Sequence, residues 1–275
     1  KAGPAMMLSF VIAGLICAAA ALAYAEVATM IPASGSAYTY SYVVIGELVA
    51  WIIGWSLILE YSLVVSAVAV GWSGYATPLL EGALSFPLQW ARGPELGGIA
   101  NLPAMFIIFV VAGLLILGTR ESATINALLV IVKIVALAVF VTVAMPYFDP
   151  ANLEPFMPYG FVKSMSGDGV ERGVMAAAAI IFFAFYGFDA IATAAEEAKN
   201  PGRDLAIGIV GSMIACVAIY MAVAVAAVGA LHFTHFANTP EPLALILRGL
   251  GQGSAATYLA ASAVIALPTV LLAFL

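Results

Sequence analysis

The sequence predicts an all-α protein that crosses a lipid bilayer several times, and three observations point to this fold class. Hydrophobic residues make up 64% of the 275 residues, and charged residues make up only 9%. A soluble domain is typically about 45–50% apolar and about 25% charged. The apolar residues gather into long runs, and a helix needs roughly 20 such residues to cross a hydrocarbon core of ~30 Å. One of these runs is interrupted past its middle by a glycine and a carboxylate.

Seven apolar runs divide the chain, and we expect them to form one transmembrane domain over residues 1–275. The predicted spans are about 5–30, 46–75, 101–118, 122–145, 173–195, 205–231 and 254–275. Only residues 119–121 separate the third span from the fourth, so these two spans should form an antiparallel hairpin. Residues 77–100, which contain several prolines and glycines, are expected to form an exposed connection that holds a short helix at most. Because the chain opens at Lys1 and closes inside an apolar run, we interpret it as a fragment of a longer protein.

The few charged and reactive residues exclude several function classes. The formal net charge of −6 rests on scattered groups, and no basic patch is present that would bind nucleic acid. Cys17 and Cys216 lie far apart in apolar runs. We therefore interpret them as small buried hydrophobic residues and not as a disulfide or a metal-binding pair. His232 and His235 are not accompanied by the further ligands that a metal site needs. Since the sequence also shows no nucleophile–base pair and no phosphate-binding loop, we expect neither an enzyme nor a metal or organic cofactor.

The interrupted span contains the stretch from Ile181 to Asp189, IFFAFYGFD. A glycine weakens a helix by about 0.8–1 kcal/mol relative to alanine. An acid at such depth is costly, and it commonly marks a pathway or a binding site. Secondary transporters interrupt helices near the bilayer midplane, where unwound backbone binds the substrate. The alternative interpretation is an intact helix with a packing glycine and an acid that faces neighbouring helices.

Ionisable residues lie inside two further spans. Lys133 is about 16 Å deep in the fourth span at a rise of 1.5 Å per residue, and therefore close to the bilayer centre. A lysine there extends to the surface, pairs with an acid, or loses its proton, and the depth favours the last two. Glu60 lies near the middle of the second span. Counting lysines and arginines in the connections leaves the orientation of the chain in the membrane open.

Several stretches of the sequence match one superfamily of transporters. They are AGPAMMLSF at 2–10, YAEVATMIPASGSAYTYSY at 24–42, GWSLILEY at 54–61, AVGWSGY at 69–75, ESATINALLVIVKI at 121–134 and FFAFYGFDAIATAAEEAKNPGRDLAIGI at 182–209. With these stretches the chain resembles the amino acid–polyamine–organocation superfamily, and within it the cationic amino acid transporter branch. The match is much more specific than a single glycine motif. Beyond about residue 209 the resemblance rests mainly on hydropathy.

The resemblance implies a fold and an orientation. Members of this superfamily have an inverted five-plus-five repeat of the LeuT type with a broken helix at the substrate site. The seven spans here would correspond to family helices two to eight, and the 173–195 span to the broken helix. The turns at 119–121 and 196–204 would then be cytoplasmic, which settles the orientation that charge counting left open.

The resemblance also implies roles for individual residues of the interrupted span. Phe183 corresponds to the aromatic gate over the substrate. Ala184, Phe185 and Tyr186 correspond to the stretch whose backbone carbonyls take the α-ammonium group of the substrate. Relatives usually carry tyrosine and then a small aliphatic residue where this chain has Phe185 and Tyr186, so the volume beside the site differs. Lys133 is similar to the lysine that takes the place of a sodium ion in proton-coupled members.

These roles together imply a secondary active transporter in the cytoplasmic membrane. It would move cationic or small neutral amino acids, or both, by alternating access, with protons as the coupling ion and with an amino acid and the lipid bilayer as its partners. Asp189 and Glu60 are the candidate acids for a cationic substrate side chain, although a structural role for each is equally compatible with the sequence. Two alternatives remain: an uncoupled amino acid or polyamine exchanger, in which Lys133 only pairs with an acid such as Glu60, and a membrane sensor or scaffold of the same fold that does not transport.

Overall fold

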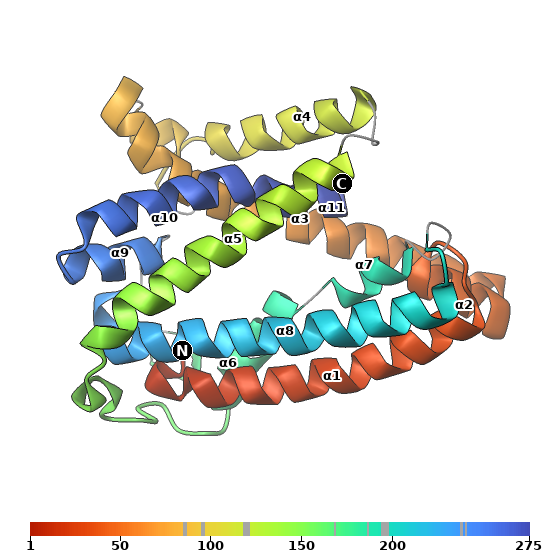
Figure 1. The fold of residues 1–275 in the computed structure, drawn as a ribbon, viewed down its shortest axis with the longest axis horizontal. Coiled ribbons are helices and arrows are strands. Elements are labelled where there is room, and N and C mark those ends of the chain that lie inside the picture. Colours follow the sequence, from red (N-terminus) through yellow and green to blue (C-terminus); the bar gives the residue numbers. More distant parts are fainter. Residues whose placement is uncertain are drawn as a thin grey trace. The chain divides into compact units, whose positions relative to one another are not determined.

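A computed structural model shows a mostly helical protein whose chain folds into two compact units (Figure 1). It describes residues 1–84, 87–94, 97–117, 122–167, 169–185, 187–193, 198–236, 239 and 241–275. The first unit comprises residues 1–57 and 148–234, and the second unit comprises residues 58–147 and 235–275. Each unit is therefore made of two segments that are far apart in the sequence.

The first unit is built on two helices of membrane length, α1 (Met6–Met30) and α8 (Pro201–Ala230). Its other elements are α2 (Ser36–Val44), the beginning of α3 (Glu47–Leu84), β1 (Ser164–Met165), β2 (Glu171–Arg172), α6 (Val174–Ile181), the 3₁₀ turn η6 (Phe182–Phe185) and α7 (Phe188–Thr193). The strands β1 and β2 form an antiparallel hairpin, in which Ser164 lies opposite Arg172. Further 3₁₀ turns of the protein cover Gly3–Ala5, Leu88–Trp90, Met145–Tyr147, Pro150–Leu153 and Phe233–His235.

Small side chains bring α1 and α8 together along most of their length (Figure 1). The buried positions of α1 recur every three or four residues, at Ala13, Cys17, Ala21, Ala25 and Ala28. They form one cluster with Leu205, Ile209 and Met213 of α8. Inside a bilayer apolar burial does not drive helices together, and small residues stabilise a helix pair because they let the two backbones approach closely.

The second unit contains the remainder of α3 together with α4 (Leu102–Leu117), α5 (Ser122–Ala144), α9 (Pro242–Gly249), α10 (Gly253–Ala266) and α11 (Pro268–Phe274). Its core joins α3, α4 and α11 through Val65, Ala69, Trp72, Ala76, Ala104, Ile107, Val111 and Leu271. Helix α5 packs against α9, α10 and α11.

A proline separates α10 from α11, and a side chain of α3 compensates for the hydrogen bond that it removes. Pro268 has no N–H, so the carbonyl of Val264, four residues earlier, loses its helical donor. The indole Nε1 of Trp72 donates to this carbonyl at 2.7 Å. The hydroxyl of Thr269 donates to the carbonyl of Ala266 at 2.7 Å. Two carbonyls that precede the proline, those of Val264 and Ala266, therefore accept hydrogen bonds from side chains.

The fold class predicted from the sequence is confirmed as a mostly helical, polytopic membrane protein. Among the described residues, six helical segments are long and apolar enough to span a membrane: Gly3–Met30, Glu47–Pro78, Asn126–Tyr147, Val174–Ala192, Arg203–Ala230 and Gly253–Phe274. The third predicted span, 101–118, corresponds to α4, which is shorter, and the 119–121 link lies outside the described residues.

One boundary differs clearly from the sequence-based expectation. We expected the second span to end near residue 75 and an exposed connection to follow, but α3 continues through Pro78 to Leu84. A proline inside a membrane helix is tolerated where neighbouring groups satisfy the freed backbone. The apolar residues around Pro78 also permit the helix to continue.

Candidate functional site

The interrupted span leaves regular helix where the sequence predicted that it would. Helix α6 ends at Ile181, the turn η6 follows, and α7 begins at Phe188. Gly187 has a φ angle of +113°, which residues with a Cβ atom rarely adopt. The predicted break is therefore confirmed, and the intact-helix interpretation is wrong. From the position of Gly187 in the sequence we expected the break at about 185–188, but it begins earlier, at Phe182. Tyr186 lies outside the described residues.

One backbone carbonyl of η6 accepts a hydrogen bond from a neighbouring helix. The hydroxyl of Tyr220, on α8, donates to the carbonyl of Ala184 at 3.0 Å. Ala184 is one of the three residues whose carbonyls were expected to face a substrate ammonium group. The sequence analysis missed Tyr220. A tyrosine in the middle of an apolar span is a usable signal, because its hydroxyl usually finds a hydrogen-bond partner when buried.

Phe185 points into the first unit and packs between α1 and α8. Its side chain is 4% exposed, and its ring centroid lies 6.3 Å from that of Phe10 and 5.3 Å from that of Tyr220. Gly14 of α1 lies beside this ring and permits close packing against α8, since a Cβ atom there would lie only 3.1 Å from Val217 Cγ2. The side chain of Phe185 therefore serves packing, and only its backbone is available for a ligand.

Two other candidate residues of the interrupted span have contrasting environments. Phe183, the predicted gate, is 46% exposed, whereas Phe185 is 4% exposed. Asp189, in the first turn of α7, is 3% exposed. The first unit thus holds a buried carboxyl group four residues after Phe185, the last residue of η6.

Lys133 belongs to the second unit, and its partner there is a hydroxyl group. Its Nζ atom donates to Oγ1 of Thr269, a residue that is 3% exposed. The hydroxyl of Thr269 in turn donates to the carbonyl of Ala266, so the three groups form a short chain from α5 to the α10–α11 interruption. The sequence predicted pairing with an acid or loss of the proton, and it did not indicate Thr269.

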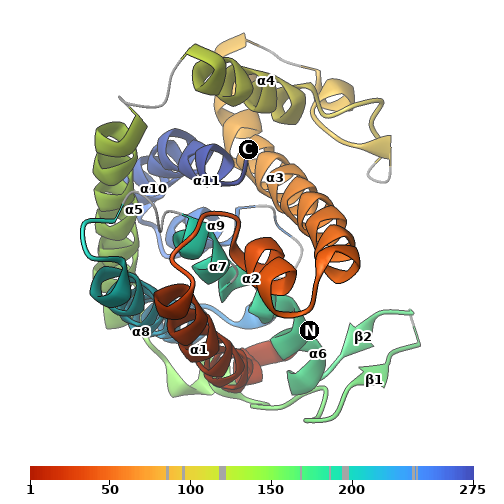
Figure 2. The same cartoon turned by 90° about the vertical axis from the view of Figure 1, so that its right-hand side faces the viewer.

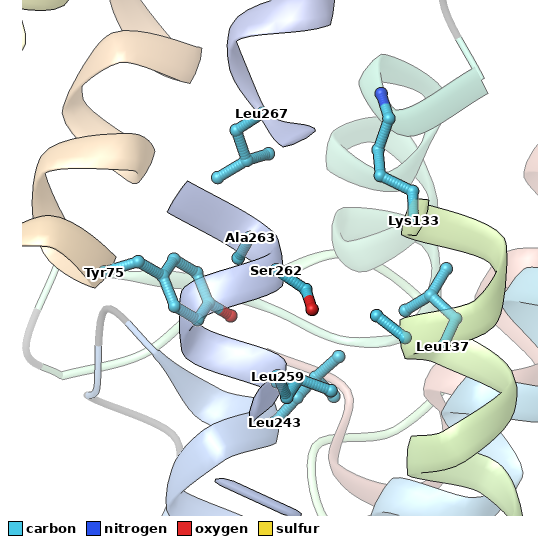
Figure 3. Close-up of a pocket in the computed structure, with 9 residues that line it drawn as sticks. Tyr75, Lys133, Leu137, Leu243, Leu259, Ser262, Ala263 and Leu267 are labelled. Atoms are coloured by element: carbon cyan, nitrogen blue, oxygen red, sulfur yellow. The ribbon is translucent and has the colours of Figure 1, made fainter. Parts of the chain in front are cut away.

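Lys133 also lines a pocket of about 210 Å³ within the second unit (Figure 3). The hydroxyls of Tyr75 and Ser262 point into this pocket, and the Lys133 amine points away from them. The rest of the lining is apolar, contributed by Ala136, Leu137, Leu243, Leu259, Ala263 and Leu267. The pocket suits an apolar group with one or two polar atoms.

Helix α9 forms one wall of this pocket through Leu243 and is fixed by an ion pair. Glu241, which precedes the helix and is 7% exposed, accepts hydrogen bonds from both terminal nitrogens of Arg248. The hydrogen bond with Glu241 raises the pKa of Arg248 above its ordinary value. The pair links the residue that precedes α9 to the last turn of the helix and so stabilises this short helix.

Glu60 lies on the exposed surface of α3 within the second unit. The residues of the interrupted span belong to the first unit, as does Tyr220, and Glu60 and Lys133 belong to the second. Within the described residues no cluster of histidine, cysteine, aspartate and glutamate has the geometry of a metal site. Nδ1 of His232 instead lies 2.8 Å from the hydroxyl of Thr234.

Comparison with known proteins gives this arrangement a family. The family described as amino acid permease matches residues 1–274. The branched-chain amino acid permease BcaP of Bacillus subtilis (strain 168) is 45% identical over 279 residues, which cover 100% of this chain and 58% of that protein. The methylthioribose transporter of the same organism is 41% identical over 277 residues, with 100% and 58% covered. The vacuolar cationic amino acid transporter 2 of Arabidopsis thaliana is 41% identical over 243 residues, with 87% and 37% covered.

The chain therefore spans less than two thirds of the length of these relatives. The resemblance to the amino acid–polyamine–organocation superfamily is confirmed, and cationic amino acid transporters are among the relatives. A family of permeases also confirms that the chain is not an enzyme. The chain belongs to the amino acid permease family.

Proposed function

We propose that this chain is part of a secondary active transporter that moves amino acids across the cytoplasmic membrane by alternating access. The observation that carries the proposal is the interruption of a membrane-length segment, Val174–Ala192, by η6 and by Gly187. Backbone that leaves regular helix inside a bilayer is tolerated only where protein buries it or where it lines a cavity. In secondary transporters such interruptions form the substrate site.

The backbone of η6 supplies the chemistry that an amino acid requires. An ammonium group needs several acceptors in fixed directions, and carbonyls released from a helix can provide them. The carbonyl of Ala184 lies in this segment and accepts from Tyr220. We propose that the substrate ammonium replaces the Tyr220 hydroxyl at this oxygen. Phe183, which is 46% exposed, would cover the bound substrate.

The overall architecture that we propose is the inverted five-plus-five repeat, with the spans of this chain as helices two to eight. The match to the amino acid permease family over residues 1–274 supports this assignment. So does the position of the interruption, which falls in the fifth predicted span and hence in the sixth helix of such a fold.

The substrate class follows from the relatives and from the buried acid. The 45% identical relative is named for branched-chain amino acids, which favours neutral substrates with an apolar side chain. The cationic amino acid transporters among the relatives, together with buried Asp189, favour cationic ones. We propose neutral amino acids as the principal substrates. Uptake of arginine tests whether cationic amino acids are a second class of substrate.

Protons are the proposed coupling ion, with Lys133 as the group that binds them. A charged amine deep in a span is expensive, and its protonation can therefore bias one conformation of a transporter over another. The hydrogen bond from Lys133 to Thr269 gives the amine a fixed position between α5 and α11. The same bond favours a second candidate, an uncoupled exchanger, because a lysine held by a buried hydroxyl can also act as a structural cross-link.

Uptake measurements on the full-length protein in liposomes test the proposal. We expect labelled leucine, alanine or arginine to accumulate above its external concentration when only a pH gradient is applied, and a protonophore should abolish this accumulation. An exchanger would take up label only into vesicles loaded with unlabelled amino acid. Absence of uptake under both conditions, with protein that is folded and correctly inserted, would contradict transport altogether.

A further inference from the structure

The connection from α5 to α6 carries large apolar side chains on its surface, although it lies outside the predicted spans. Phe156, Met157, Phe161, Val162 and Met165 are 39%, 46%, 49%, 73% and 70% exposed. Exposed apolar groups that cluster in this way usually mark a contact with another molecule or with a membrane. We call residues 156–165 the apolar connection.

The backbone of the apolar connection is held firmly against the beginning of α6. The N–H groups of Val174 and Met175 donate to the carbonyls of Gly160 and Phe161, each at 3.1 Å. The first turn of a helix has N–H groups without intrahelical partners, and the connection satisfies two of them here. Phe156 is also fixed, because its carbonyl accepts from the N–H of Ala5 at 2.9 Å.

Gly173 permits this close approach. It has a φ angle of +114°, and a Cβ atom there would lie 2.5 Å from the carbonyl oxygen of Val162. The β1–β2 hairpin then closes the loop by pairing Met165 with Glu171. The exposed apolar side chains are thus displayed by an ordered backbone.

The apolar connection is hydrogen-bonded to the first turn of a membrane-length segment. The membrane-length segment begins at Val174, which is hydrogen-bonded directly to Gly160. In Figure 2 the β1–β2 hairpin extends outward from α6, on the side away from α8. The hairpin therefore lies beside the beginning of this membrane-length segment.

Two cationic side chains in and beside the apolar connection have local partners. Nζ of Lys163 lies 2.6 Å from Oε1 of Glu171, and the guanidinium of Arg172 lies over the ring of Tyr159 at 4.8 Å from the centroid. Long cationic side chains and tyrosine rings are typical of the membrane–water interface, where apolar and polar parts are both satisfied. Local pairing of this kind lowers the cost of placing the charges among headgroups.

We propose that the apolar connection is an interfacial anchor that inserts Phe161, Val162 and Met165 into the bilayer leaflet at the beginning of α6. The partner is the lipid surface itself, because the exposed apolar side chains lie beside the first turn of a membrane-length segment and the neighbouring cations Lys163 and Arg172 have local partners. The anchor fixes the depth of the first turn of α6, which leads into the interruption at Phe182. This inference requires membrane insertion of the protein and does not depend on which solute it transports.

Site-directed spin labelling of the full-length protein in phosphatidylcholine nanodiscs tests the anchor. Cys17 and Cys216 are replaced by alanine, and single cysteines are introduced as Val162→Cys, Met165→Cys and, as a matched control on the same connection, Glu154→Cys. Glu154 is exposed and polar. We expect the labels at 162 and 165 to be more accessible to oxygen than to a water-soluble nickel chelate, and the label at 154 to show the reverse.

The other outcomes overturn the proposal. Preferential access of the nickel chelate to positions 162 and 165 would place the connection in water, and exclusion of both reagents would show that protein covers it. Replacing part of the lipid by an anionic one should leave the labels at the same depth, since the local charges are paired. If the cysteine variants do not fold, a photoactivatable phospholipid used on the unmodified protein should label residues 156–165 and leave residues 150–154 unlabelled.

Discussion

Gly187 shows how a single residue can set the conformation of the interrupted span. Its φ angle of +113° lies in a region that a Cβ atom makes unfavourable. The sequence indicated this break by a glycine and a carboxylate past the middle of one apolar run, although a packing glycine in an intact helix remained the alternative. The start of the break at Phe182 was not predictable, because no residue between 178 and 185 disfavours helix strongly.

Gly187→Ala tests the requirement for a positive φ angle. We expect the free energy of unfolding to fall by about 1–3 kcal/mol, the usual cost of holding a residue in a sparsely populated backbone conformation. Unfolding by SDS in mixed micelles measures the change. Gly211→Ala is the control, since this glycine lies within α8 and a Cβ atom there would meet nothing within 4 Å. Equal stabilities of the two variants would show that Gly187 does not need its positive φ angle.

Tyr220→Phe tests the proposed exchange of hydrogen bonds at Ala184. The variant keeps the ring beside Phe185 and removes the hydroxyl that donates a hydrogen bond to the carbonyl of Ala184. A typical hydrogen bond contributes about 0.5–1.5 kcal/mol. In the variant the substrate ammonium does not have to replace the Tyr220 hydroxyl, so the substrate should bind about 2- to 10-fold more tightly. Equilibrium binding of labelled amino acid to the full-length protein measures the dissociation constant.

The control for this prediction is Tyr42→Phe, at an exposed tyrosine of α2, which should bind with unchanged affinity. An unchanged dissociation constant for Tyr220→Phe would place the ammonium group elsewhere. The Tyr220–Ala184 contact joins residues 36 positions apart, and it depends on how α8 is rotated against η6. Hydropathy contains no information on that rotation, which explains why the sequence did not reveal the pair.

At the scale of elements, the junction of α10 and α11 depends on a partner from a different helix. Pro268 removes the donor for the carbonyl of Val264, and Trp72 of α3 replaces it. The sequence placed Pro268 inside the last predicted span but gave no indication of Trp72, because the two residues meet only in the packed unit. The membrane-length helices were predictable, since each corresponds to an apolar run, whereas α2 and α9 lie between the predicted spans.

A double-mutant cycle tests this compensation. Trp72→Phe should lower the free energy of unfolding by about 1–3 kcal/mol, because the carbonyl of Val264 is left without a donor. In the background of Pro268→Ala the loss should be smaller, since residue 268 then supplies an N–H to the same carbonyl. The difference between the two losses is the coupling energy. The change in ring packing contributes to both losses and therefore cancels in their difference.

SDS unfolding of the four proteins in mixed micelles measures the cycle, with Trp51→Phe as a control at a tryptophan that is 61% exposed. Equal losses in both backgrounds would mean that the indole N–H of Trp72 does not compensate for Pro268. A loss for Trp51→Phe as large as that for Trp72→Phe would point to general effects of removing an indole.

At the scale of the whole molecule, the proposed coupling of protons to transport depends on Lys133. Lys133→Met keeps most of the apolar stem and removes the charge. We expect this variant to bind amino acid but to lose accumulation driven by a pH gradient. Uptake and binding by the same full-length preparation in liposomes separate the two properties.

Thr269→Val is the matched variant for this prediction, because it removes the hydroxyl that Lys133 bonds to and keeps the size of the side chain. It should retain accumulation with a changed dependence on pH. Accumulation by Lys133→Met at the level of the unmodified protein would make Lys133 a structural residue and would favour the exchanger. The Lys133–Thr269 pair joins residues 136 positions apart, a separation at which sequence pattern gives no contact information.

The division of each unit into two distant segments has a consequence for synthesis of the protein. Helix α1 ends at Met30, and its principal partner α8 begins only at Pro201. At about 5–20 residues per second, the ribosome needs on the order of 10–30 s to reach that partner. During this interval α1 waits in the membrane while residues 58–147 of the other unit are inserted. Glu26 is the one charged residue from Met6 to Met30, so α1 is apolar enough to remain in lipid without its partner. Packing of α1 against α8 is therefore a late event of biogenesis.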